Sequence, residues 1–135
     1  MPIIQRITDV PHPARYSHAV VATGPIAFIA GQVALDADGK LVGPGDLAAQ
    51  TDQALRNLET VLTELGADWG DVVRLSWYLV DVSEIQTVRD TLEAYLRPVL
   101  TERPNPASTL IQVAALFRPD VLVEVDAVVS LRETE

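Results

Sequence analysis

The sequence contains no cysteine, which excludes disulfide bonds, thiolate catalysis, zinc–thiolate sites and iron–sulfur clusters. It also has few basic residues: 10 Lys and Arg stand against 19 Asp and Glu, and the formal net charge is −9. A surface of that sign repels phosphate backbones. Because the basic residues are also scattered along the chain, nucleic-acid binding is disfavoured.

Long hydrophobic runs are missing as well. No apolar stretch approaches the ~20 residues that a membrane span needs. The N-terminal segment 1–6 lacks the basic region followed by an apolar region that marks a secretory signal. These absences predict a soluble, cytoplasmic protein. No metal or other cofactor is expected, since the two histidines, His12 and His18, have no patterned acids beside them.

Apolar residues are plentiful, at 48% of the 135 positions, and they suffice for the core of one domain spanning residues 1–135. Apolar runs bounded by turn residues predict strands, and stretches with a 3.6-residue apolar period predict helices. The expected strands are 3–7, 16–22, 26–33, 71–80 and two within 106–129, and the expected helices are 47–65 and 83–97. We expect 16–22 and 26–33 to form one hairpin, and the two runs within 106–129 to pair across a turn at 117–120.

The helix ends carry their own signals. Asp46 is a favourable N-cap for the first helix, and Gly66 follows as its C-cap. Ser83 and Gln86 have the spacing of a capping box at the start of the second helix. Pro98 is expected to stop that helix.

This order of elements predicts an α+β fold in which two helices cover one face of a mostly antiparallel sheet. Several of the expected strands are apolar on both faces, notably 26–35 and 110–116. The face without helices should therefore be buried against another chain. A homo-oligomer with closed symmetry is the expected arrangement.

An acidic pair, Glu124 and Asp126, lies inside an otherwise apolar strand. Residues i and i+2 of a strand share a face, so both carboxylates should point the same way. Glu124 has two interpretations: a carboxylate that polarises a water molecule beside an electrophilic carbon, or one that accepts hydrogen bonds from backbone amides. Its apolar surroundings favour the first. A second unusual strand residue is Gly31, which predicts a β-bulge or a close approach by another group.

Arg89 lies at the edge of the apolar face of the second helix, near Ile85. Its stem can cover apolar surface while the guanidinium reaches water. The alternative is that the guanidinium binds an anionic ligand.

Five short motifs occur in the order and spacing of one protein family. They are YSHAV at 16–20, GQVALD at 31–36, QT at 50–51 with QAL at 53–55 and NL at 57–58, DVV at 71–73 with YLVD at 78–81, and PA at 106–107 with QVAAL at 112–116 and VEVDA at 123–127. With these motifs the sequence resembles the RidA/YjgF family, also labelled endoribonuclease L-PSP, over nearly its whole length.

The resemblance implies a chorismate-mutase-like fold and a homotrimer with one ligand pocket at each subunit interface. Founding members of the family hydrolyse reactive enamine and imine intermediates, such as 2-aminoacrylate, to a 2-oxo acid and ammonia. Members with that activity carry an arginine directly after the Pro-Ala of the fifth motif, where it binds the substrate carboxylate with both ends of its planar fork. Here that position is Ser108, which cannot supply the charge and places the chain in an arginine-lacking subgroup.

At the other pocket positions, this sequence matches the family pattern at some residues and departs from it at others. Tyr16 and Gly31 are retained, while Ala30 replaces a small hydroxyl residue that often precedes this glycine. Leu110 occupies the position whose backbone helps hold the attacking water, and Glu124 matches the glutamate that orients or activates that water. Asp126 has no such counterpart, and we expect it to pair across a subunit interface or to lie in solvent.

Two further residues matter for the ligand. Arg89 occupies a position where pocket-forming relatives have asparagine, so it is a candidate replacement for the missing cation. Ser108 as a nucleophile is disfavoured, since no His–Asp pair is placed to activate it and no G-x-S-x-G motif is present. A hydrogen bond from Ser108 to the ligand or the backbone is expected instead.

These features predict that the protein binds a small carboxylate- or carbonyl-bearing metabolite, with Tyr16, Ala30, Gly31, Arg89 and Ser108 as binding residues. If the protein is an enzyme, the reaction is hydrolysis of an enamine, imine or related C–N bond by water held between Glu124 and the Leu110 backbone. The alternative is a non-catalytic ligand-binding or chaperone-like trimer that lacks deaminase activity. An RNA-cleaving translation inhibitor is disfavoured by the net charge.

Overall fold

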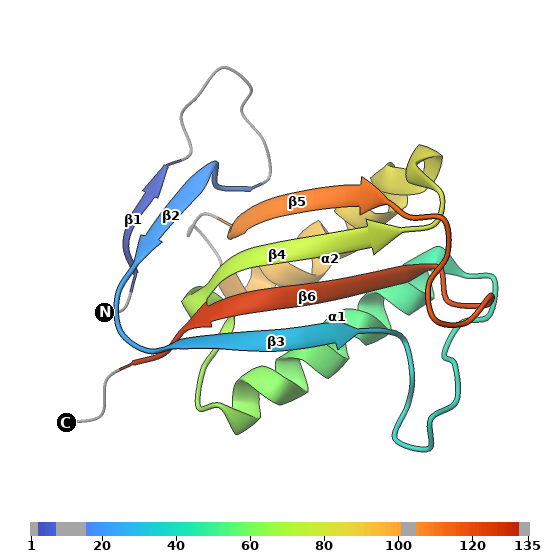
Figure 1. Ribbon diagram of the computed structural model, residues 1–135, viewed down its shortest axis with the longest axis horizontal. Coiled ribbons are helices and arrows are strands. Elements are labelled where there is room, and N and C mark those ends of the chain that lie inside the picture. The colour runs from blue at the N-terminus through green and yellow to red at the C-terminus, as the bar shows by residue number, and fades with distance from the viewer. Residues whose placement is uncertain (1–2, 8–15, 101–104, 133–135) are drawn as a thin grey trace.

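The computed structural model describes residues 3–7, 16–100 and 105–132, which form strands, helices and two short 3₁₀ turns (Figure 1). The strands are β1 (Ile3–Ile7), β2 (Ala19–Ala22), β3 (Ile26–Gln32), β4 (Val72–Leu79), β5 (Ala107–Gln112) and β6 (Val123–Ser130), and the helices are α1 (Leu47–Glu64) and α2 (Ile85–Leu100). The 3₁₀ turns are Trp69–Asp71 and Val82–Glu84. The expected α+β class is confirmed.

The main sheet has the strand order β3-β6-β4-β5. β6 pairs antiparallel with both β3 and β4, whereas β5 pairs parallel with β4. The predicted pairing of the two runs within 106–129 is therefore wrong, because β4 lies between β5 and β6. Strands two places apart are separated by about 10 Å, a distance that the ten-residue connection 113–122 spans easily.

The predicted hairpin of 16–22 with 26–33 is also wrong. β2 pairs with β1 in a separate two-stranded sheet, and β3 pairs with β6. β2 is shorter than expected, because Ser17 instead makes a single parallel bridge to Ala107 at the start of β5. His18 consequently precedes the strand in which it was predicted, and His12 lies outside the described residues.

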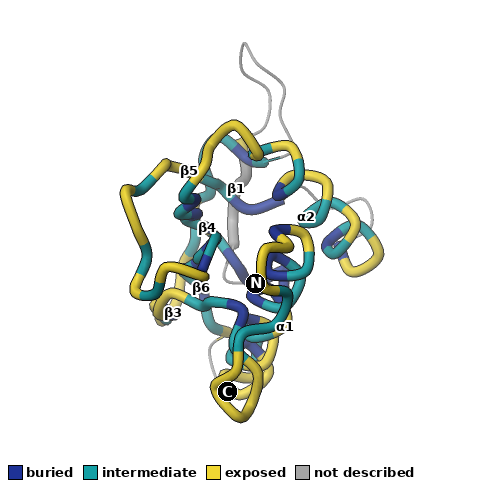
Figure 2. Tube along the Cα trace, turned by 90° about the vertical axis from the view of Figure 1, so that its right-hand side faces the viewer, coloured by how far each residue is buried: buried dark blue, intermediate teal, exposed yellow. Residues whose placement is uncertain are grey.

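Both helices cover the same face of the main sheet, and the buried residues lie between these two layers (Figure 2). Alternate residues of the central strands, Leu75 and Trp77 of β4 and Val125 and Ala127 of β6, point into this core. The apolar stripe of α1 packs against them, as its 3.6-residue period predicts.

The predicted start of α1 is confirmed, and its end lies within one residue of the prediction, with Leu65 instead of Gly66 as the C-cap. Asp46 is the N-cap, and its carboxylate accepts a hydrogen bond from the Ala49 amide at 3.0 Å. Gly66 follows the helix with a φ of 71°, in the left-handed region that glycine adopts most readily. Asp52 and Arg56, which are four residues apart, form an ion pair on the exposed side of α1 at 2.7 Å.

The predicted ends of α2 are wrong at both sides. Asp81, rather than Ser83, caps the 3₁₀ turn that leads into the helix, because its carboxylate accepts from the Ser83 amide at 3.0 Å. Pro98 lies inside the helix, which continues to Leu100. Leu96 and Leu100, on either side of Pro98, are fully buried. Their packing in the core offsets the loss of the backbone hydrogen bond that a proline cannot donate.

The opposite face of the main sheet has no helix over it among the described residues. Large apolar side chains are exposed there: Phe28 at 80%, Ile111 at 48% and Ile26 at 41%. The polar residues of this face include Arg74, whose guanidinium donates to the Thr109 hydroxyl at 3.0 Å. We call this surface, formed by the outward residues of β3 to β6, the open face.

Candidate functional site

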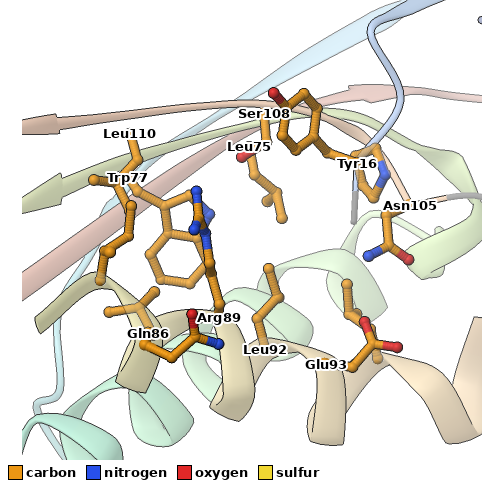
Figure 3. A pocket seen from close by; sticks show the side chains of 14 residues that line it. Tyr16, Leu75, Trp77, Gln86, Arg89, Leu92, Glu93, Asn105, Ser108 and Leu110 are labelled. Atoms are coloured by element: carbon orange, nitrogen blue, oxygen red, sulfur yellow. The ribbon is translucent and has the colours of Figure 1, made fainter. Parts of the chain in front are cut away.

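A cleft of about 570 Å³ lies between α2 and the strands β4 and β5 (Figure 3). It is lined by Tyr16, Leu75, Trp77, Ile85, Gln86, Val88, Arg89, Leu92, Glu93, Leu96, Asn105, Pro106, Ser108 and Leu110. Its walls are therefore mostly apolar, with a few polar groups at the ends, which is the usual composition of a small-molecule site.

The parallel pairing of β5 explains which of its residues enter the cleft. Ser108 lies opposite Leu75 and Leu110 lies opposite Trp77, so both share the face that is turned to the helices. Tyr16 reaches the same place because Ser17 is fixed to the start of β5. The structure thus brings together four predicted site residues that are far apart in sequence: Tyr16, Arg89, Ser108 and Leu110.

Arg89 spans the cleft from the helix side. Its side chain leaves α2 and extends toward Trp77 and Leu110 of the sheet (Figure 3). Within the described ranges, its guanidinium makes no hydrogen bond and no ion pair. Arg89 therefore combines the two sequence interpretations: its stem covers apolar surface, and its charged head remains available to an anion.

The second charged residue of the cleft is Glu93, one helical turn after Arg89. Its carboxylate accepts from the Arg97 guanidinium at 2.9 Å, and Arg97 also donates to the Asn105 side chain at 2.7 Å. The negative charge of Glu93 is thereby compensated within α2. At the other end, the Gln86 amide donates to Asp90 at 2.8 Å.

The remaining predicted residues lie elsewhere. Glu124 points to the open face, and it is separated from β5 by β4, with Tyr78 directly opposite it. Gly31 lies beside it on β3, where the register shifts between Ile29 and Gln32. A Cβ atom at residue 31 would overlap the Glu124 carboxylate. Both predictions for this glycine, a bulge and a close approach, are confirmed, and Ala30 occupies the exposed position just before it.

The surroundings of the Glu124 carboxylate bear on its two interpretations. It is half-buried, and it accepts no hydrogen bond from the part of the chain that the structure describes. Burial raises the pKa of the Glu124 carboxyl group above its ordinary value, and the charge of Asp126 raises it further. These properties agree with the first interpretation of Glu124 and not with a carboxylate satisfied by backbone amides.

Asp126 has a partner that the sequence analysis missed. The Tyr78 hydroxyl donates to its carboxylate at 2.8 Å, and this bond, together with burial, raises the pKa of Tyr78. The expectation that Asp126 would lie unpaired in solvent is therefore wrong, whereas its pairing across a subunit interface stays a prediction. The alternation of β4 and β6 could have indicated this pair, but only once these two strands were known to be neighbours.

The Asp126→Asn variant tests the electrostatic coupling of the acidic pair. Removing the Asp126 charge should lower the pKa of Glu124 toward its ordinary value, while burial keeps part of the shift. The amide oxygen of Asn can still accept from Tyr78. A carbon-detected NMR titration of the Glu124 carboxyl group measures the change, with the exposed-turn variant Asp38→Asn as control. An unchanged midpoint in Asp126→Asn would show that the two carboxylates do not interact.

The sequence model of the family described as endoribonuclease L-PSP matches residues 7–131. A RutC family protein from Synechocystis is 36% identical over 132 residues, which cover 97% of each chain. The chain belongs to the RidA/YjgF (endoribonuclease L-PSP) family.

Other relatives of this RidA/YjgF protein include one with a named activity and several with solved structures. A mouse protein named 2-iminobutanoate/2-iminopropanoate deaminase is 35% identical over 113 residues, covering 84% of this chain and 78% of that protein. A crystal structure of a Rid-family protein of unknown function from Yersinia pestis superposes with a TM-score of 0.86 at 35% identity, covering 97% and 100% of the two chains. The YjgF gene product from Escherichia coli gives a TM-score of 0.72 at 26% identity and 94% coverage of both.

Among the described residues, no cluster of three or more His, Cys, Asp or Glu side chains has the arrangement of a metal site. In the same part of the chain, neither helix is both long and apolar enough to cross a membrane.

His18 contacts the Tyr16 ring, with the ring centroids 5.1 Å apart, and it contributes to positioning that cleft residue.

Proposed function

We propose that this RidA-family protein forms a homotrimer, binds a small carbonyl- or carboxylate-bearing metabolite in clefts between its subunits, and hydrolyses a C=N bond there. The observation that carries the proposal is the division of the predicted site. One set of residues lines the cleft beside β5, and the other lies beside β3. A single copy of the chain therefore holds both sets without bringing them together.

A closed ring of copies would join the two sets. β3 and β5 are the opposite edges of the main sheet. In a cyclic assembly, one edge of each subunit meets the other edge of its neighbour. Because the cleft lies on the helix side of β5 and Glu124 lies on the open face, the two sheets would meet at an angle that turns Gly31 and Glu124 of one copy toward the cleft of the next. The open face would become the interior of the ring, which would bury the exposed Phe28 and Ile111 side chains.

The chemistry that fits is the addition of water to an imine. The water oxygen bonds to the carbon of C=N while Glu124 accepts one water proton and passes it to the imine nitrogen, which gives a carbinolamine. Glu124 then transfers the hydroxyl proton of the carbinolamine to the nitrogen, so the carbonyl forms and ammonia leaves as the C–N bond breaks. Glu124 suits this role because its raised pKa makes it a stronger base than an ordinary carboxylate. The backbone of Leu110 at the cleft would help to hold the water. The product is a carbonyl compound, and no electrons are gained or lost.

Release of ammonia tests the reaction. Imino acids are generated in situ by an amino-acid oxidase acting on several amino acids, and the rate of ammonia formation is compared with and without the protein. Acceleration across at least one class of imino acid is expected. If none is accelerated while 2-oxo acids still bind to the protein, the function is ligand binding without catalysis.

Ligand binding without catalysis, the alternative function, has one observation in its favour. Ser108 stands where deaminases of the family have the arginine that binds the substrate carboxylate, and its hydroxyl carries no charge. A trimer that binds metabolites without hydrolysing them would retain the cleft and lack only this anchor.

A further inference from the structure

We infer that Arg89 is the anion-binding residue of the cleft, and that the cleft selects acids with a bulky apolar body over the smallest 2-oxo or 2-imino acids. The inference rests on the proposed binding site between α2 and β5, but it does not require that site to be catalytic. It names both the group that holds the ligand and the ligand class.

The charge balance of the cleft points to Arg89. Its lining contains one carboxylate, Glu93, and this carboxylate is paired with Arg97 at 2.9 Å. The guanidinium of Arg89 has no such partner within the described ranges. The cleft thus presents one uncompensated positive charge in a chain of net charge −9. A carboxylate that enters the cleft finds a planar two-pronged donor there.

The position of the guanidinium also fits the proposed chemistry. Arg89 reaches from α2 toward Leu110 on β5, at the same end of the cleft (Figure 3). A ligand carboxylate on Arg89 would place the adjacent carbon, the C=N or C=O carbon of a 2-imino or 2-oxo acid, next to Leu110. The arginine on α2 would thus hold the acid from the helix side, whereas residue 108 approaches from the sheet.

The rest of the cleft is built for an apolar body. Beyond Arg89, its walls are formed by large apolar side chains, namely Leu75, Trp77, Ile85, Val88, Leu92 and Leu96. At about 570 Å³, the cleft lies within the range of sites for ligands much larger than a three-carbon acid. A benzyl or isobutyl group would fill space that a methyl group leaves to water, and its burial favours binding.

The far end of the cleft is polar. Tyr16 and Asn105 lie at the end opposite Gln86 and Arg89, and Ser108 lies beside Tyr16 (Figure 3). These groups can receive a hydroxyl or amide at the tip of the ligand. The preferred ligand is therefore a 2-imino or 2-oxo acid with an aromatic or branched aliphatic side chain, with or without a polar tip.

Calorimetric titration of the full-length protein with phenylpyruvate, pyruvate and the neutral ketone 1-phenyl-2-propanone tests both parts. Wild type should bind phenylpyruvate at least about tenfold more tightly than pyruvate. Arg89→Gln should weaken phenylpyruvate binding by about tenfold or more and leave the neutral ketone unaffected. Arg89→Lys keeps the positive charge but lacks the planar fork, so its affinity for phenylpyruvate should lie between those of wild type and Arg89→Gln. Arg56→Gln on the exposed side of α1 is the matched control and should bind as wild type does.

Several outcomes would overturn the inference. Equal phenylpyruvate affinity in wild type and Arg89→Gln, or no binding of phenylpyruvate to wild type, refutes the anchor. Pyruvate binding as tightly as phenylpyruvate refutes the apolar selectivity. These failures differ from failure of the proposed function: imine hydrolysis that is unchanged in Arg89→Gln removes the anchor alone, whereas Arg89-dependent binding without any ammonia release removes the reaction alone.

Discussion

The Glu124→Gln variant should hydrolyse imines about 10²- to 10⁴-fold more slowly than wild type, the usual loss when a general base is removed. The amide has nearly the same size as the carboxylate, so it still fits beside Gly31, which has no Cβ atom to obstruct it. It cannot accept the proton of the attacking water. The loss should therefore appear in kcat, while binding of a 2-oxo acid product is largely retained. Steady-state ammonia release and calorimetry separate the two effects.

The fold should not suffer from this substitution. The pKa of Glu124 is raised in the folded protein, so its charged form costs stability at pH values above that pKa, and the cost fades as the pH falls through it toward the unfolded value. The neutral amide avoids the cost, so Glu124→Gln should unfold at or above the wild-type denaturant midpoint at neutral pH. Glu64→Gln, at the exposed end of α1, is the matched control for activity. Wild-type turnover in Glu124→Gln would remove Glu124 from the mechanism.

Local patterns predicted the individual elements well. α1 begins after Asp46 and ends before Gly66 because both residues act within one helical turn, through a side-chain cap and a left-handed backbone. Likewise, Glu124 and Asp126 share a face because strand alternation is a local property. Such features depend on neighbours in sequence, so the sequence alone sufficed for them.

Strand order and the second helix end could not be predicted in the same way. An apolar run in the sequence does not specify which strand it pairs with. β4 lies between β5 and β6 because its backbone forms hydrogen bonds to both of these strands, one along each edge. Pro98 is a helix breaker by local rules, yet α2 continues past it because Leu100 is buried in the core. Tertiary packing decided both cases.

The site could be predicted only in part, because some of its contacts depend on which strands are neighbours. The family motifs indicated Ser108, Leu110 and Tyr16, and the structure places them in one cleft. The hydrogen bond from Tyr78 to Asp126 was missed, since a tyrosine in an apolar strand resembles an ordinary core residue. Finding it required the register of β4 against β6.

The central claim is that each site is shared between two copies of the chain, with the cleft from one and Glu124 from the next. Two inactive variants test it in combination. Glu124→Gln lacks the base, and Ser108→Trp fills the cleft with an indole ring. Each variant alone should release ammonia at no more than about 1% of the wild-type rate.

The decisive measurement is ammonia release by mixed oligomers of these two variants, co-expressed with different affinity tags and purified through both. If the sites are shared, some of them combine the open cleft of a Glu124→Gln subunit with the intact Glu124 of a Ser108→Trp subunit. In a trimer that contains both variants, one of the three sites is complete, so about a third of wild-type activity should return. Mixed oligomers that are as inactive as the two variants alone would contradict the shared site.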